Sequence, residues 1–544
     1  MIFWYGFNPY IPKFIVQTDK IRYFTYLTRE SFRTVLSGVT RVYIKCPHYE
    51  PKKRKLTGTW SVIKKKTNSP VLVVETAESL HTSFFGCQNV LNFLSLLLTD
   101  CPLASPFAKG VLMKRIILPF SCILVLMLCV CSAPNYGDLT TVAPEKVGLS
   151  GERLARMDAL VQKYVDDGKI AGAVTLVARH GTIAHLKATG MMDREAAKPM
   201  RTDTIFRIAS MTKPITSLAV MMLYEEGRFL LSDPVSRYIP EFRDMRVLAP
   251  EARNTEATPS STTVPANREI TIRDLLTHTS GITYQWNPAL GKMYHDAGIT
   301  HGLVQDDGTI GDDVRALARI PLLFQPGGEF HYGINIDVLG YFVEVVSGMT
   351  LDEFFRTRIF EPLGMNDTFF YAPEDKAGRL ATVYMFNEKD GLRRFPDEPV
   401  VEGSFVYSAD YPYKGPRTYF SGGGGLCSTA GDYARFCQMM LNGGELDGVR
   451  LVSRKTVEFM TTDHLGKISS ETAFGLGFGI EGVKTPLSEL TSPGRYGWGG
   501  FWSTHFFIDP KEDMLGVFMV QLHPADGVTL NNILEVLAYQ AVSD

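Results

Sequence analysis

The sequence predicts an α+β fold, in which an antiparallel β-sheet is flanked by helices and accompanied by an α-rich domain. Two short β-prone runs, at residues 173–178 and 182–186, are separated by a turn signal and indicate a hairpin. Residues 504–508 and 514–522 form a second such pair near the C-terminus. The pattern from about residue 210 to 430 is mainly one of helices and loops. We therefore expect the two strand pairs to share one sheet, with the α-rich domain between them.

Helical periodicity identifies the elements that would cover this sheet. Ser150 is an N-cap candidate for a helix that ends near Gly168, and residues 530–542 form a second apolar-faced helix at the C-terminus. A third helix begins just after Ser210 and has Gly227 as its C-cap candidate. Two covering helices and one buried helix are what a layered α+β fold requires.

Ser210-Met211-Thr212-Lys213 is the motif that carries the chemistry. A serine hydroxyl is a weak nucleophile until a neighbouring base takes its proton, and residues three apart on a helix share one face. Lys213 would therefore lie beside Ser210, at a helix N-terminus that favours developing negative charge. Ser61 and Lys64 have the same spacing, but their surroundings show no helical period. We take Ser210 as the candidate nucleophile and Lys213 as a candidate base.

The sequence around this motif resembles a known superfamily. Residues 206–214 are similar to the serine β-lactamase and penicillin-binding superfamily, in particular its class C-like branch, which includes family VIII carboxylesterases. Residues 275–281 give a supporting match, and the resemblance extends over roughly residues 145–540. It implies a β-lactamase/transpeptidase-like fold and an acyl-enzyme mechanism.

Two further elements of that branch have counterparts in the expected order. Tyr332 follows a Pro-Gly turn, and the resemblance assigns it as the catalytic tyrosine that shares proton transfer with Lys213. Trp498, Gly499 and Gly500 resemble the edge-strand element beside the serine. The resemblance implies an oxyanion hole made of the Ser210 N–H and a backbone N–H after Gly500, that of Phe501. Whether the lysine or the tyrosine is the base stays open.

Two departures from the branch point to a substrate class. Ile334 stands where relatives that bind amides have an asparagine, and Trp498 stands where they have a lysine that attracts a substrate carboxylate. Asn335 could replace the asparagine only if the turn shifted. These changes favour a carboxylesterase acting on small neutral esters. One alternative is a β-lactamase or D-Ala-D-Ala carboxypeptidase, and another is a non-catalytic penicillin- or cell-wall-binding relative.

Several other classes of protein are disfavoured by the sequence. It contains no His-Glu-x-x-His, its 11 histidines are scattered, and no Gly-x-Ser-x-Gly elbow occurs. The glycine run at residues 422–425 lacks the Gly-Lys-Ser/Thr ending of a phosphate loop, so we interpret it as a tight bend next to the site. We expect no metal and no cofactor, and a small-molecule ester, lactam or peptide as the substrate.

The first part of the chain has a different character. Residues 113–133 combine a basic start, an apolar run and a small-residue cleavage site, which is typical of a secretory signal peptide. We therefore interpret residues 1–112 as a mis-assigned N-terminal extension, the alternative being a true basic domain. The serine hydrolase domain would then comprise residues 134–544 and be periplasmic or secreted.

Charge is divided along the same boundary. Residues 1–112 carry 15 Lys+Arg and 6 Asp+Glu, a net of +9, whereas residues 134–544 carry 39 and 52, a net of −13. An acidic domain gives no reason to expect binding to nucleic acid or to an anionic membrane surface. The predicted apolar run is also short for a span, so we expect no stable membrane insertion after cleavage.

Overall fold

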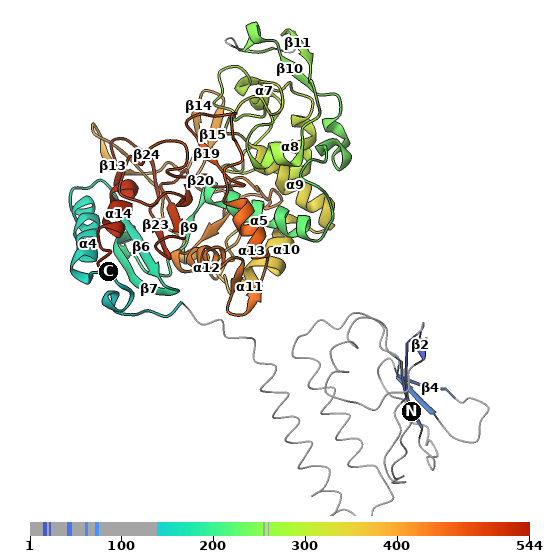
Figure 1. The fold of residues 1–544 in the computed structure, drawn as a ribbon, viewed down its shortest axis with the longest axis horizontal. Helices are drawn as coiled ribbons and strands as arrows, with labels where there is room; N and C mark the ends of the chain where they lie inside the picture. The colour runs from blue at the N-terminus through green and yellow to red at the C-terminus, as the bar shows by residue number, and fades with distance from the viewer. Residues whose placement is uncertain are drawn as a thin grey trace, which may run out of the picture. The chain divides into compact units, whose positions relative to one another are not determined.

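The computed structural model describes residues 139–544, except 254–255 and 259–260, and five strands nearer the N-terminus (Figure 1). The chain divides into two compact units, Met1–Ala133 and Pro134–Asp544. The sequence patterns did not predict the strands of the first unit. They pair antiparallel in the order β2 (Ile21–Arg22), β1 (Ile15–Thr18), β3 (Arg41–Lys45), β5 (Val71–Val74) and β4 (Trp60–Ile63).

The predicted signal peptide at residues 113–133 lies outside the described residues. Export of the protein and the interpretation of residues 1–112 as an extension therefore stay predictions. The boundary between the two units falls directly after Ala133, where the cleavage site is predicted. In the part of the chain that the structure describes, none of the helices combines the length and apolarity needed to cross a membrane.

The second unit is built on one large antiparallel sheet, as the sequence predicted. The strand β23 pairs with β6, so the C-terminal strands join the hairpin at the start of the unit. The strand order is β19 (Ala473–Phe474), β20 (Gly479–Ile480), β21 (Tyr496–Gly499), β22 (His505–Asp509), β23 (Met514–Met519), β6 (Gly172–Arg179), β7 (Thr182–Asp193) and β8 (Lys198–Pro199).

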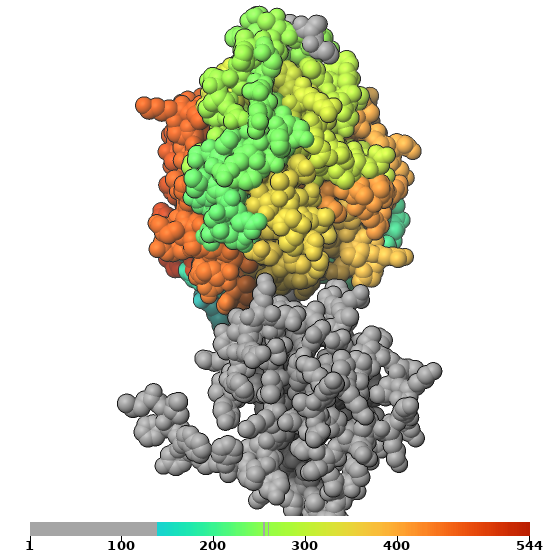
Figure 2. Space-filling model, turned by 90° about the vertical axis from the view of Figure 1, so that its right-hand side faces the viewer, coloured from blue at the N-terminus to red at the C-terminus, as the bar shows by residue number. Residues whose placement is uncertain are grey.

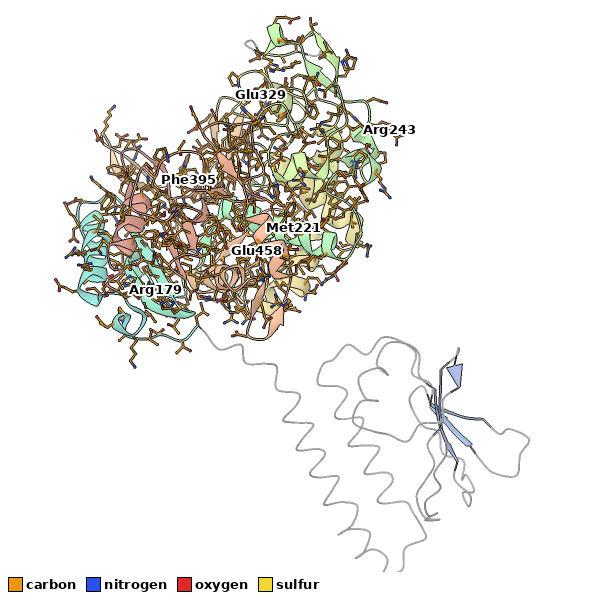
Figure 3. All side chains as sticks on the ribbon, in the orientation of Figure 1. Arg179, Met221, Arg243, Glu329, Phe395 and Glu458 are labelled. Atoms are coloured by element: carbon orange, nitrogen blue, oxygen red, sulfur yellow. The ribbon has the colours of Figure 1, made fainter. Side chains whose placement is uncertain are left out.

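Turn chemistry explains the hairpin between β6 and β7. His180 and Gly181 have φ values of 52° and 74°, and two successive positive φ values suit the twist of a two-residue hairpin loop. Figure 3 labels Arg179 at the end of β6, where its guanidinium donates to the Asp544 carboxylate at 2.8 Å. The hairpin is thereby connected to the end of the chain.

The predicted strand at residues 514–522 is shorter than expected. It ends at Met519, and Leu522 begins β24 (Leu522–Ala525), which pairs parallel with β12 (Tyr384–Asn387) beside β13 (Gly391–Arg394). The break occurs because Gln521 is buried and its side-chain amide bonds the backbone N–H and carbonyl of Arg207. The segment 514–522 is thus divided between two different sheets.

Helices cover both faces of the large sheet, as predicted (Figure 1). On one face lie α4 (Gly151–Asp166) and α14 (Leu530–Tyr539), and Ser150 caps α4 by accepting the Arg153 N–H at 3.3 Å. On the other face lie α5 (Thr212–Glu225) and α12 (Ala430–Leu441). Twelve of the fourteen residues of α5 are buried, which makes it the central helix of the unit.

The α-rich part shares the apolar core of the sheet. In Figure 2 the green chain near residue 250 lies beside the yellow chain near residue 350, and Arg228 donates to the Val346 carbonyl at 2.7 Å. Besides α5, its helices are α6 (Ile272–Leu276), α7 (Gly291–Asp296), α8 (Ile310–Leu317), α9 (Asn335–Ser347), α10 (Leu351–Phe355) and α11 (Glu361–Leu363). Two hairpins also lie here: β10 (Arg246–Leu248) with β11 (Thr263–Pro265), and β14 (Val400–Glu402) with β15 (Phe405–Tyr407).

Candidate active site

Ser210 lies in a turn that directly precedes α5. The turn Ala209–Met211 is a single 3₁₀ turn, and Ala209 within it has a φ of 42°, a conformation that costs free energy for a residue with a side chain. Ala209 is buried at 1% exposure, so packing holds the strained residue in place. Ser210 itself is only partly buried. Its hydroxyl is therefore presented at the start of the central helix.

Lys213 is buried and uses all three of its donors. Its ammonium lies 3.2 Å from Ser210 Oγ, 2.9 Å from the Tyr284 hydroxyl and 2.6 Å from the Gly423 carbonyl. The same nitrogen is 4.8 Å from the centre of the Tyr332 ring. A buried ammonium with three acceptors and a ring face is well satisfied. The structure thus brings together Ser210, Lys213 and Tyr332, which the sequence predicted as neighbours.

Tyr332 is held between two aromatic side chains. Its hydroxyl accepts a hydrogen bond from Trp498 Nε1 at 3.2 Å, and its ring lies 4.8 Å from the ring of His278. Burial and the nearby Lys213 charge hold the pKa of His278 well below its usual value, so this imidazole is neutral. His278 Nδ1 accepts the Gly333 N–H at 3.3 Å. The histidine therefore supports the turn that carries Tyr332.

The expected loss of an asparagine at this turn has a structural counterpart. Ile334 is 2% exposed and packs into the apolar core. Asn335 does not replace the missing amide, because its side chain is fully buried and bonded to Ser280 Oγ, His278 Nδ1 and the Ile282 carbonyl. Neither residue presents a side-chain amide to a substrate.

Tyr284 is a site residue that the sequence reasoning missed. It lies three residues after the 275–281 segment, and its hydroxyl is the one that contacts Lys213. Burial holds the pKa of Tyr284 well above its usual value, and the neighbouring Tyr332 raises it further. Tyr284 therefore remains a phenol at neutral pH and can position Lys213. The position of Tyr284 shortly after the 275–281 segment was a signal that it could lie near the site. The sequence of that segment did not show where the Tyr284 side chain points.

The end of β21 lies against the turn that carries Ser210. A side chain on Gly500 would overlap the Ile208 carbonyl oxygen and Thr504 Oγ1. Glycine is thus required here by backbone packing. A side chain on Gly499 would make only ordinary van der Waals contacts, the nearest with the Thr504 carbonyl oxygen at 3.5 Å. Within the described residues, no hydrogen bond occupies the backbone N–H of Ser210 or of Phe501.

This difference between the two glycines can be measured. We expect Gly500→Ala to lower the free energy of unfolding by about 1–3 kcal/mol, because the added methyl group has to push β21 away from Ile208. Gly499→Ala should change it by less than about 0.5 kcal/mol. Urea denaturation of both variants checks the prediction. Equal losses would show that the two positions are packed alike.

A buried carboxyl group supports the loop behind Lys213. Asp337 Oδ1 accepts hydrogen bonds from Ser421 Oγ at 2.6 Å and from the Gly423 N–H at 3.1 Å, while the Gly423 carbonyl accepts from Lys213. A side chain on Gly423 would overlap Asp337 Oδ2. The glycine run at residues 422–425 is therefore a tight bend next to the site, as the sequence indicated.

A second carboxyl in this region predicts a pH dependence of stability. Burial raises the pKa of Asp313 from 3.8 to about 7; the Thr300 N–H opposes this rise, and Asp306 and Asp337 add to it. Between these pH values the folded protein binds more protons than the unfolded chain, so its free energy of unfolding falls as pH increases. We expect Asp313→Asn to remove about 1–3 kcal/mol of this fall between about pH 4 and 7. Urea denaturation across that range tests it, and unchanged pH profiles would contradict it.

Two hollows of the second unit lie away from the predicted site. Two hollows among the described residues have volumes of about 210 Å³ and about 510 Å³. The first lies between the end of β23 and α14, and the second beside the end of α5. Neither is lined by a predicted site residue. Among the described residues, no group of three or more His, Cys, Asp or Glu side chains is arranged to hold a metal ion.

The fold and the meeting of Ser210 with Lys213 define a hydrolase of the serine β-lactamase and penicillin-binding superfamily. The chain belongs to the Beta-lactamase family, whose sequence profile matches residues 157–540. This confirms the resemblance and the fold class that the sequence predicted.

The relatives of this chain include an esterase and a carboxypeptidase-like protein. Esterase EstB of Burkholderia gladioli is 33% identical over 364 residues, which are 65% of this chain and 87% of that esterase. An Escherichia coli K12 protein, provisionally assigned as a D-alanyl-D-alanine carboxypeptidase, is 31% identical over 430 residues, 75% of this chain and 90% of that protein. The solved structure of EstCE1, a hydrolase with promiscuous acyltransferase activity, has a TM-score of 0.60 and 29% identity, covering 72% of this chain and 99% of that one.

Proposed function

We propose that this protein is a serine hydrolase that works through an acyl-enzyme, with small neutral esters as its principal substrates. The observation that carries the proposal is the buried ammonium of Lys213, 3.2 Å from the hydroxyl of Ser210 and 4.8 Å from the ring of Tyr332. A hydroxyl, an amine and a phenol in this arrangement are sufficient for nucleophilic catalysis with proton transfer.

In the first half of the reaction, Ser210 Oγ bonds to the ester carbonyl carbon and gives up its proton. Because Tyr284 stays a phenol, the proton acceptor is Lys213 or Tyr332. The Lys213 nitrogen is surrounded by three acceptors, which leaves it no lone pair directed at Ser210, so the proposed acceptor is the Tyr332 oxygen in its phenolate form. The Lys213 charge and the Trp498 N–H stabilise negative charge on that oxygen.

The remaining steps follow from the same groups. The N–H groups of Ser210 and Phe501 are free to donate to the negative carbonyl oxygen of the tetrahedral intermediate. When the carbon–oxygen bond to the alcohol breaks, the alcohol leaves with the proton held by Tyr332. Water then attacks the acyl group and gives a proton to the same tyrosine oxygen. That oxygen passes the proton to Ser210 Oγ as the bond between Oγ and the acyl carbon breaks, so the acid leaves and Ser210 is restored.

Preference for a neutral ester is supported by the groups around Ser210. Trp498 presents a ring where a cation would attract a carboxylate, and the ring lies 5.3 Å from that of Phe474. Ile334 and Asn335 offer no free amide. The similarity to esterase EstB supports this preference, while the carboxypeptidase-like relative supports the alternative of a β-lactamase or D-Ala-D-Ala carboxypeptidase.

A substrate panel on the full chain separates these functions. We expect turnover of p-nitrophenyl butyrate to exceed that of nitrocefin and of a D-Ala-D-Ala peptide. Peptide hydrolysis with negligible ester turnover would establish the alternative. The third possibility, a non-catalytic binding protein, is tested by a fluorophosphonate probe and mass spectrometry. An adduct on Ser210 excludes it, and an unlabelled Ser210 in folded protein supports it.

A further inference from the structure

Trp286 is a large apolar side chain that the fold leaves exposed. Its exposed fraction is 49%, although its ring stacks on that of Tyr284 with centres 4.1 Å apart and planes at 25°. The hydroxyl of Tyr284 contacts Lys213, which contacts Ser210. The exposed indole is thus separated from Lys213 by a single ring, that of Tyr284.

A second series of rings connects Trp286 with the other side of Ser210. The Trp286 ring lies 5.0 Å from the ring of Phe405, and Phe405 lies 5.8 Å from Phe501. Phe405 and Phe501 pack in the same apolar cluster as Ala209, the residue before Ser210. We name these four rings, Tyr284, Trp286, Phe405 and Phe501, the aromatic shelf. Its two ends lie next to the proton-transfer groups and next to the oxyanion donors.

The shelf is rigid and uncharged. Phe405 stacks on the ring of His301 with centres 4.1 Å apart, and Phe501 lies 3.7 Å from the ring of His523. Burial lowers the pKa of His301 to about 3 and that of His523 to about 4, so both supporting rings are neutral at physiological pH. A surface that is already ordered loses little conformational entropy when a ligand binds.

Trp286 carries the accessible surface of the shelf. It meets Phe405 at 63°, and Phe405 is only 3% exposed, so the exposed part of this corner is the Trp286 ring, on which a planar group can stack. Offset stacking and edge-to-face contact are the arrangements that aromatic rings favour, and a saturated ring lacks the π-system on which both depend. An indole that is half exposed at such a corner offers a free face for this contact.

We propose that the aromatic shelf binds a planar aryl group of the substrate, so that this hydrolase prefers aryl-bearing esters to saturated esters of the same size. The inference rests on the proposed esterase function. The aryl group stacks on Trp286, while the ester carbonyl lies at Ser210 between the two ends of the shelf. The aryl group comes from either the alcohol or the acid of the ester.

Two matched ester pairs test the proposal on the full chain. Phenyl acetate and cyclohexyl acetate carry the ring on the alcohol, whereas methyl benzoate and methyl cyclohexanecarboxylate carry it on the acid. We expect Trp286→Ala to lower kcat/KM for the aryl member of at least one pair by about 3- to 10-fold relative to its saturated partner. Comparing variant with wild type within a pair cancels the intrinsic reactivity of each ester.

Controls separate the shelf from other effects. Trp286→Phe keeps a ring and should retain most of the aryl preference. Val401→Ala removes another exposed apolar side chain, 63% exposed on the β14–β15 hairpin, and should leave both ratios unchanged. Equal losses for aryl and saturated esters in both pairs would overturn the shelf while leaving the esterase function intact.

A binding measurement makes the two proposals independent. Binding of methyl benzoate is measured by isothermal titration calorimetry on Ser210→Ala protein, alone and combined with Trp286→Phe or with Trp286→Ala. Weaker binding of methyl benzoate in the Trp286→Ala variant than in the Trp286→Phe variant supports the aromatic shelf. This conclusion holds even if the wild-type protein turns over none of the four esters, a result that would contradict the esterase function alone. Binding that does not depend on position 286 contradicts the shelf.

Discussion

Replacing Ser210 by alanine should reduce kcat for every ester that the protein turns over by about 10⁴- to 10⁶-fold. The Ser210 hydroxyl is the group proposed to bond to the carbonyl carbon, and it lies 3.2 Å from the Lys213 ammonium. Steady-state hydrolysis of p-nitrophenyl butyrate measures the loss. The folded state of the variant is checked by far-UV circular dichroism, since removing one partly exposed hydroxyl should leave the structure intact.

Ser61 supplies a matched control for this experiment. It begins the other Ser-x-x-Lys tetrapeptide of the chain, in the strand β4 of the first unit. Ser61→Ala in the same full chain should retain wild-type kcat and wild-type labelling by a fluorophosphonate. If Ser210→Ala kept its activity while Ser61→Ala lost it, the assignment of the nucleophile would be wrong.

The second large effect distinguishes the two tyrosines near Lys213. We expect Tyr332→Phe to lower kcat by about 100- to 10,000-fold, because it removes the oxygen proposed to carry the proton. Tyr284→Phe removes one hydrogen bond to the ammonium, and we expect a loss of about 10-fold. Single-turnover kinetics with p-nitrophenyl butyrate compares the two variants. A larger loss in Tyr284→Phe would move the proton-transfer role to Tyr284.

Both tyrosine variants leave an aromatic ring in place, which makes the comparison a clean one. Tyr332→Phe keeps the ring that lies 4.8 Å from the Lys213 ammonium, and it loses the acceptor of the Trp498 N–H. Tyr284→Phe keeps the stacking contact with Trp286. The effect on shelf binding should therefore be small in both variants, while the effect on proton transfer should differ by at least about 10-fold.

The sequence by itself was sufficient for the features that depend on local spacing. The three-residue interval between Ser210 and Lys213, followed by a helical period, predicted that the two side chains meet, and they do so with Ser210 in the 3₁₀ turn before α5 and Lys213 in the first turn of α5. Short β-prone runs and helical periods likewise predicted the central strands of the large sheet and its covering helices. Where the apolar run at residues 514–522 had no alternation, its division between two sheets was not predictable from the pattern.

Only the tertiary structure decided which distant side chains meet at Ser210. Tyr284 contacts Lys213 across 71 positions of the chain, and Asp337 contacts the Gly423 peptide across 86. Phe405 meets Trp286 because the β14–β15 hairpin packs beside the loop after α6. Such contacts depend on how complete elements pack, and sequence patterns encode only the face that each element buries. The candidate nucleophile, Lys213 and Tyr332 were therefore readable from the chain, while Tyr284, Asp337 and the contacts between the rings required the folded molecule.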